Sequence, residues 1–174
     1  MRRLAPLLLV AAVGLTVLAG AAWAGGAAAW PRTMALADGS TVVVAKDGHV
    51  VHRDAKGQPE EESWCESGAA WVRRVQLFSA FRAAVLKGDR TRATALVAYP
   101  LGWNHGGRHD TLASAAALAN AWPRVFTPGV LAALRGADPQ ALFCKNGSQF
   151  TAGVGAVWGQ ETGGRPRIFS VSSF

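Results

Sequence analysis

The segment from Leu142 to Phe174 reads LFCKNGSQFTAGVGAVWGQETGGRPRIFSVSSF. Its apolar residues follow a strand-like period rather than a helical one. Asn146-Gly147 is a dipeptide typical of a tight hairpin turn, and Gly163-Gly164 marks a second turn. We predict strands over 142–145, 150–160 and 167–174. The long middle strand carries Gly153 and Gly155, which indicate a bulge or a bend.

The residues before this segment favour helices. Five apolar residues recur at helical spacing and predict a helix over 71–87 whose apolar face enters the core. They are Trp71, Val75, Phe78, Phe81 and Val85. The basic residues of the same stretch are expected on the surface of the protein: Arg73, Arg74, Arg82 and Lys87.

Three shorter helices follow the long one. Asp89, after Gly88, caps a helix that reaches Leu96 or Val97. Another is expected over 114–122, ended by Pro123 because the proline ring clashes with the preceding turn. Thr127-Pro128 combines a cap with a proline at the first helical position, and it predicts a last helix to about Arg135.

Residues 33–57 have the pattern of a small β-meander. The β-branched run TVVVA, from Thr41 to Ala45, is flanked on both sides by Asp-Gly, a dipeptide that tolerates the positive φ of a hairpin turn. The run from His49 to Arg53 is expected to return as the next strand. The acidic stretch from Gln58 to Glu62 is expected to be a solvated linker leading into the first helix.

The beginning of the chain has the features of a secretory signal. Met1-Arg2-Arg3 is a short positive region, Leu4 to Leu18 is apolar and uncharged, and Ala22-Trp23-Ala24 fits the site that a signal peptidase accepts. We expect cleavage near Ala24 and a periplasmic or secreted protein. The alternative is an uncleaved anchor, because apolar and small residues continue to Trp30, far enough to span a bilayer.

Composition and charge limit the classes of partner. Cleavage of the 174-residue chain leaves about 150 residues, the size of one domain. The formal net charge of +7 favours anionic lipid, cell-wall polymer or an acidic protein as partner, or serves solubility alone. No motif combines basic and aromatic residues for nucleic acid. We therefore expect no nucleic-acid partner, and contact with the membrane only during export.

The two cysteines, Cys65 and Cys144, are far apart in the sequence. An even number in an oxidising compartment predicts one disulfide, which would close a loop of about 80 residues. The alternative is two buried free thiols, because free cysteine packs as a small hydrophobic residue. A zinc cluster is not expected, since its ligands normally come in pairs close in sequence.

Strands, then helices, then an antiparallel meander predict an α+β fold. Six short segments after Phe78 also carry a family resemblance: Phe81-Arg82, Gly88-Asp89, Leu96–Leu101, Val125–Pro128, Leu142-Phe143 and Gly153–Trp158. In these segments the chain resembles periplasmic members of the nuclear transport factor 2-like (SnoaL-like) cone superfamily. The resemblance implies a curved antiparallel sheet with helices packed on one face and a cavity at its open end. Relatives include isomerases and cyclases, as well as proteins that only bind or dimerise.

The expected organisation has three parts. Residues 1–24 are the signal peptide, and 25–62 form an N-terminal β-hairpin segment with its linker. Residues 63–174 form the α+β cone-like domain.

The polar stretch NHGGRHD, from Asn104 to Asp110, is expected to be a loop that carries the chemistry of the protein. Imidazole and carboxylate are ligands that zinc and copper use, so His105, His109 and Asp110 are candidate metal ligands. The alternative is that they are ordinary exposed side chains. Five residues form the candidate ligand or partner loop: Tyr99, Trp103, His105, His109 and Asp110.

No nucleophile–base motif and no phosphate-binding loop stand out. We therefore expect an exported envelope protein that acts as a non-enzymatic binding or accessory domain for a small apolar ligand or an envelope protein, without a cofactor. Three alternatives stay open: a metal-binding periplasmic protein, an inhibitor or immunity protein of an envelope enzyme, and a cone-fold isomerase or hydrolase-like enzyme. Some relatives pair through the outer face of the sheet, so a homodimer is open as well.

Overall fold

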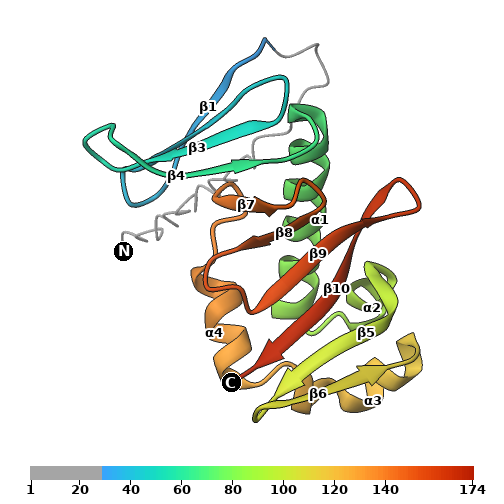
Figure 1. Ribbon diagram of the computed structural model, residues 1–174. Helices are drawn as coiled ribbons and strands as arrows, with labels where there is room; N and C mark the ends of the chain where they lie inside the picture. Colours follow the sequence, from blue (N-terminus) through green and yellow to red (C-terminus); the bar gives the residue numbers. More distant parts are fainter. Residues whose placement is uncertain (1–28) are drawn as a thin grey trace, which may run out of the picture.

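The computed structural model describes residues 29–174, so the expected signal peptide and its cleavage near Ala24 lie outside the described residues. The described part is α+β, with ten strands and four helices (Figure 1). No helix in this part is long and apolar enough to cross a membrane. In chain order the elements are β1 (Arg32–Ala35), β2 (Thr41–Val44), β3 (His49–Arg53), β4 (Pro59–Trp64), α1 (Gly68–Leu86), α2 (Arg90–Ala95), β5 (Val97–His105), β6 (Arg108–Leu112), α3 (Ala115–Val125), α4 (Pro128–Gly136), β7 (Leu142–Lys145), β8 (Gln149–Ala152), β9 (Val157–Thr162) and β10 (Arg165–Ser173).

Strands β1 to β4 form a four-stranded antiparallel sheet in sequence order. The predicted meander is confirmed, and both Asp-Gly turns place their glycine at positive φ. The prediction of a linker over 58–62 was wrong, because Pro59–Trp64 is strand β4 and pairs with β3. Its glutamates are exposed, so their charges stay in water while the backbone completes the sheet. The expected boundary between residues 62 and 63 falls inside this strand.

The other strands form a six-stranded sheet in the order β6-β5-β10-β9-β8-β7. Four of its five strand pairs are antiparallel, but β5 and β10 run parallel, so the sheet is mixed rather than purely antiparallel as expected. The predicted long strand over 150–160 was also wrong. Residues 153–156 turn back between β8 and β9, where Gly153 and Gly155 have positive φ.

Helices cover the face of the six-stranded sheet that carries its core residues, and α1, α3 and α4 all contact β10 (Figure 1). Helix α1 begins three residues earlier than predicted, because the Ser67 side chain accepts a hydrogen bond from the Ala70 N–H and caps it. The predicted cap at Thr127 is confirmed, since its Oγ1 accepts from the Val130 N–H.

Helix α3 continues through Pro123 to Val125, so the predicted stop at Pro123 was wrong. Proline has no N–H to donate to the carbonyl oxygen of Ala119, four residues earlier. Arg90 supplies the missing donor, because its Nη1 donates to that oxygen over 3.3 Å. A side chain from another helix thus satisfies the group that the proline leaves free.

The two sheets meet at the predicted Cys65–Cys144 disulfide, which is confirmed. Cys65 follows β4, Cys144 lies in β7, and both are buried. A disulfide suggests a non-reducing compartment.

Arg74 of α1 lies beneath this bridge and is fully buried, contrary to the expected surface position. Its Nε donates to the Glu161 carboxylate over 3.2 Å, and its Nη1 to the Gly147 carbonyl over 2.7 Å and towards Cys144 Sγ over 3.3 Å. Its Nη2 lies 3.5 Å from the carboxylate of Glu66. The charge of this arginine therefore connects the end of the first sheet with the β7–β8 hairpin and with β9.

Candidate functional site

The stretch Asn104–Asp110 is the tip of a β-hairpin and not the loop that we expected. Strand β5 runs to His105, strand β6 starts at Arg108, and only two residues connect them. These residues are Gly106 and Gly107, with φ of 52° and 75°. Two successive residues with positive φ form the type of turn that matches the twist of a hairpin, and glycine adopts it without strain.

The hairpin register divides the candidate residues between two faces. Trp103 lies opposite Asp110, and Asn104 lies opposite His109. Side chains directly opposite share a face, whereas neighbours along a strand alternate. Trp103, His105 and Asp110 are therefore on one face and His109 is on the other.

On the first face, His105 joins Trp103 to Asp110. Its ring stacks on the indole of Trp103, with 3.9 Å between centroids, and its Nε2 lies 2.7 Å from Asp110 Oδ2. An ionised carboxylate only accepts hydrogen bonds, so Nε2 donates. This hydrogen bond holds the pKa of the Asp110 carboxyl below its ordinary value of 3.8, and the nearby charges of His105, Arg108 and His109 lower it further.

The indole of Trp103 is fixed from two further directions. Its Nε1 donates to Ser173 Oγ over 3.0 Å, and Ser173 Oγ in turn donates to the Val125 carbonyl over 2.6 Å. The guanidinium of Arg124, from the last turn of α3, lies 5.6 Å from the ring centroid. Cation and ring attract each other at this distance.

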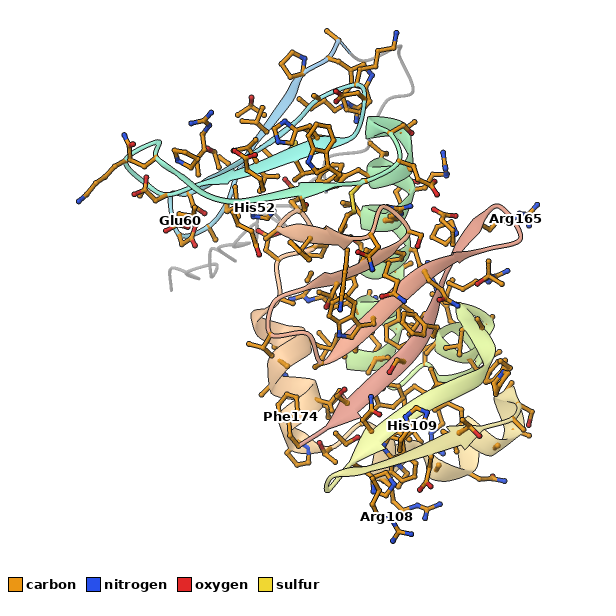
Figure 2. All side chains as sticks on the ribbon, in the orientation of Figure 1. His52, Glu60, Arg108, His109, Arg165 and Phe174 are labelled. Atoms are coloured by element: carbon orange, nitrogen blue, oxygen red, sulfur yellow. A yellow bond between two sulfur atoms is a disulfide. The ribbon has the colours of Figure 1, made fainter. Side chains whose placement is uncertain are left out.

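An open hollow of about 550 Å³ lies against this group. Its walls come from the hairpin, from the ends of α3 and β10 and from the cap of α4: Trp103, His105, Gly106, Arg124, Thr127, Ser173 and Phe174. The Phe174 side chain is 68% exposed, and Thr127 Oγ1 donates to its carbonyl over 3.3 Å. Figure 2 shows Phe174 beside the hairpin, while Arg108 points away from the sheet. We call this hollow the hairpin-end pocket.

On the other face, Asn104 organises a polar network. Its Oδ1 accepts from His109 Nδ1 over 2.7 Å, and its Nδ2 donates to the hydroxyls of Ser170 and Ser172, each over 3.3 Å. A neighbouring hollow of about 610 Å³ opens towards Asn104, His109 and Ser172 around the hairpin tip. Each of these polar groups already has a partner, so the network orients the side chains on this face.

Tyr99 is not brought to the hairpin-end pocket. It precedes Pro100 in β5, and its hydroxyl donates to the Thr94 carbonyl at the end of α2 over 3.2 Å. Burial raises the pKa of this phenol above its ordinary value of 10.0. Its surroundings therefore keep it neutral, as a structural hydrogen-bond donor.

The three candidate metal ligands do not converge on one point. His105 and Asp110 bond to each other, and His109 turns to Asn104 across the strand. Within residues 29–174 no group of three or more histidine, cysteine or acidic side chains is placed to hold a metal ion.

Sequence reasoning did not find Arg124, Thr127 or Phe174, which complete the pocket. Arg124 lay outside every predicted element, Thr127 was assigned only as a helix cap, and Phe174 only to the last strand. The signal that could have found them is the parallel pairing of β5 with β10, which brings the end of β10 beside Trp103 and His105. No protein-family model matches this chain, and no curated protein matches its sequence.

Proposed function

We propose that this chain is an exported binding or accessory domain of the cell envelope, and that its ligand is a small apolar molecule with one anionic group. The observation that carries the proposal is the hairpin-end pocket, where an aromatic wall and an unpaired cation meet. Pockets for small molecules are mostly apolar, with a few polar groups that fix orientation.

The charges around the pocket favour an anion. Arg124 is exposed, and no carboxylate pairs with it in the described part of the chain. Asp110 carries the only negative side chain near the hairpin tip, and His105 already binds it. Trp103 and Phe174 offer apolar surface to the ligand body, while Arg124 offers donors to its charged end.

Export is supported by two independent features. The first residues have the pattern of a cleavable signal, with Ala22-Trp23-Ala24 at its end. The Cys65–Cys144 bridge fits a compartment in which disulfides persist.

Membership of the cone superfamily is supported by the order of elements. A long helix packs across the six-stranded sheet, a hairpin follows it, and the meander β7 to β10 completes the sheet.

A binding role is favoured over catalysis by the state of the hydroxyls. Ser173 Oγ accepts from Trp103 and donates to Val125, so its proton is not available to a base. His105 Nε2 is held by Asp110 rather than by a nucleophile. The pair therefore fixes the hairpin tip, and it has no hydroxyl to activate.

The test uses anilinonaphthalene sulfonate, a fluorescent probe with an aromatic body and one sulfonate. We expect saturable binding with a blue-shifted emission, weakened by up to about fivefold in Arg124→Gln, because one charge contact near the surface contributes up to about 1 kcal/mol. Phe174→Ala should weaken binding as well, since it removes an apolar wall.

Arg73→Gln is the control, because Arg73 is also an exposed arginine but lies on α1, outside the pocket. Its affinity should equal that of the wild type. If the wild type, the two pocket variants and the control all bind the probe with equal affinity and unfold at the same temperature, the probe binds elsewhere and the proposal is overturned.

A further inference from the structure

A separate hollow of about 420 Å³ lies where the two sheets meet, far along the six-stranded sheet from the hairpin β5–β6. Figure 2 labels His52 at this boundary. The hollow is lined from both sheets, by His52, Glu61, Ala141, Phe143, Thr151, Gly153, Gly155 and Trp158. We call it the junction pocket.

The six-stranded sheet lines the junction pocket with two aromatic side chains and a small residue between them. Phe143 lies opposite Thr151 in the β7–β8 pair, and Thr151 lies opposite Trp158 in the β8–β9 pair. The three side chains thus form a row on the face that the helices leave uncovered. Neighbouring strands are about 4.8 Å apart, so the aromatic residues are rooted about 10 Å apart with the shorter threonine between them. The row forms a slot suited to a flat group.

The four-stranded sheet lines the junction pocket with a carboxylate and an imidazole. Glu61 and His52 are directly opposite each other in the β3–β4 pair, so they share a face of their sheet. Glu61 makes no ion pair within residues 29–174. Its neighbours in sequence are Glu60 and Glu62, so β4 is an acidic strand in a chain of net charge +7.

His52 presents a polar atom that the fold does not satisfy. Its Nε2 is shielded from solvent and has no hydrogen-bond partner among the described residues. Buried polar atoms are nearly always paired, so this atom is an exception in a histidine that lines the hollow.

We propose that the junction pocket binds a guanidinium group, as found in an arginine side chain. A guanidinium is flat, stacks on aromatic faces and binds carboxylates through two parallel hydrogen bonds. It therefore fits the slot between Phe143 and Trp158 and pairs with Glu61. The site is independent of the hairpin-end pocket, which presents a cation and selects an anion.

One cation already lies near this slot. Lys145 Nζ is 5.9 Å from the centroid of the Trp158 ring, and it lines the next hollow along the sheet with Gln149 and Phe169. Trp158 separates the two hollows. Lys145→Gln removes a competing positive charge and should tighten binding of the guanidinium.

The probes are N-acetyl-arginine amide and its citrulline counterpart, which has the same shape but an uncharged ureido group. Calorimetry on the full chain should show saturable binding of the arginine compound with a dissociation constant in the millimolar range. The citrulline compound should bind about tenfold more weakly or not at all, because it loses the ion pair and the cation–π attraction.

Glu61→Gln removes the charge without changing shape and should weaken binding of the arginine compound about fivefold or more. Glu60→Gln is the matched control, because Glu60 is the adjacent glutamate of β4 and does not line the pocket. Both side chains are exposed, so both variants should unfold at the wild-type temperature. The proposal is overturned if the two probes bind equally, if neither binds, or if the two variants behave alike.

Discussion

Replacing Arg74 by methionine tests the contact between the two sheets most directly. Methionine keeps the length and apolar stem of the side chain but removes the guanidinium. The substitution would leave the Glu161 carboxylate, whose side chain is 13% exposed, without its cation. It would also remove the shorter of the two hydrogen bonds to the Gly147 carbonyl, which keeps only the one from the Glu66 N–H over 3.4 Å.

The expected loss of stability follows from these two contacts. Removing one partner of a buried ion pair typically costs about 3–5 kcal/mol, and the loss of a hydrogen bond from a charged donor about 1.5–3 kcal/mol. The two contributions overlap, because both arise from the same desolvated pocket. We expect Arg74→Met to lower the free energy of unfolding by about 4 kcal/mol. This is a large part of the stability of an ordinary domain.

Urea unfolding of the oxidised protein at neutral pH measures this loss by linear extrapolation. The double variant Arg74→Met, Glu161→Gln is the informative control, because it removes the uncompensated charge. It should be more stable than the single variant by about 1–2 kcal/mol. A single variant within about 1 kcal/mol of the wild type would refute the reasoning. So would a double variant no more stable than the single one, since the charge of Glu161 would then not be the cause.

Two further predictions concern the disulfide and the tyrosine. The Cys65–Cys144 bridge joins residues 79 positions apart, so loop-closure entropy predicts that Cys65→Ser, Cys144→Ser loses about 4.5 kcal/mol in urea unfolding; a loss below about 1 kcal/mol would contradict this. Tyr99 is the only tyrosine of the chain, so the rise in tyrosinate absorbance in the near ultraviolet reports this one group. The phenol of Tyr99 should ionise above pH 10.0. Because the folded pKa is raised, stability should fall as pH rises from the unfolded pKa through the folded one, and Tyr99→Phe should remove that part of the fall. Ionisation at or below pH 10.0 in the folded protein would refute the burial effect.

Local signals predicted much of the fold. The Asp-Gly turns, the caps at Asp89 and Thr127 and the turn at Gly163-Gly164 depend on neighbours in sequence, and all of them are confirmed. Each rests on the φ angle or hydrogen bonding of a few adjacent residues, so no knowledge of the tertiary structure is needed.

The errors have a common physical origin in distant partners. Pro123 stays inside α3 because Arg90, 33 positions earlier, caps the free carbonyl. Pro59–Trp64 becomes a strand because β3 offers it an edge. Arg74 is buried because Glu161, 87 positions away, neutralises it. Residue type alone predicted a linker, a helix end and a surface charge at these three places.

The candidate site was predicted in part for the same reason. His105 and Asp110 were selected together and do form a pair. The hairpin was missed because the strands beside Gly106-Gly107 carry polar residues on both faces, so they lack the alternation that indicates a half-buried strand. The alternation of faces then separates His109 from the other two. Arg124 and Phe174 join the site only through the packing of α3 and β10.

The position of the disulfide also determines which incorrect disulfides can form while the protein folds. Cys65 leaves the ribosome long before Cys144, so its thiol has no intramolecular partner until most of the protein has been made. With two cysteines there is only one intrachain pairing, and the chain needs no isomerase to correct a wrong one. The one available error is a bond between two molecules. Misfolded material should therefore accumulate as covalent dimers and longer chains, and a gel run without reductant separates it directly from the native monomer.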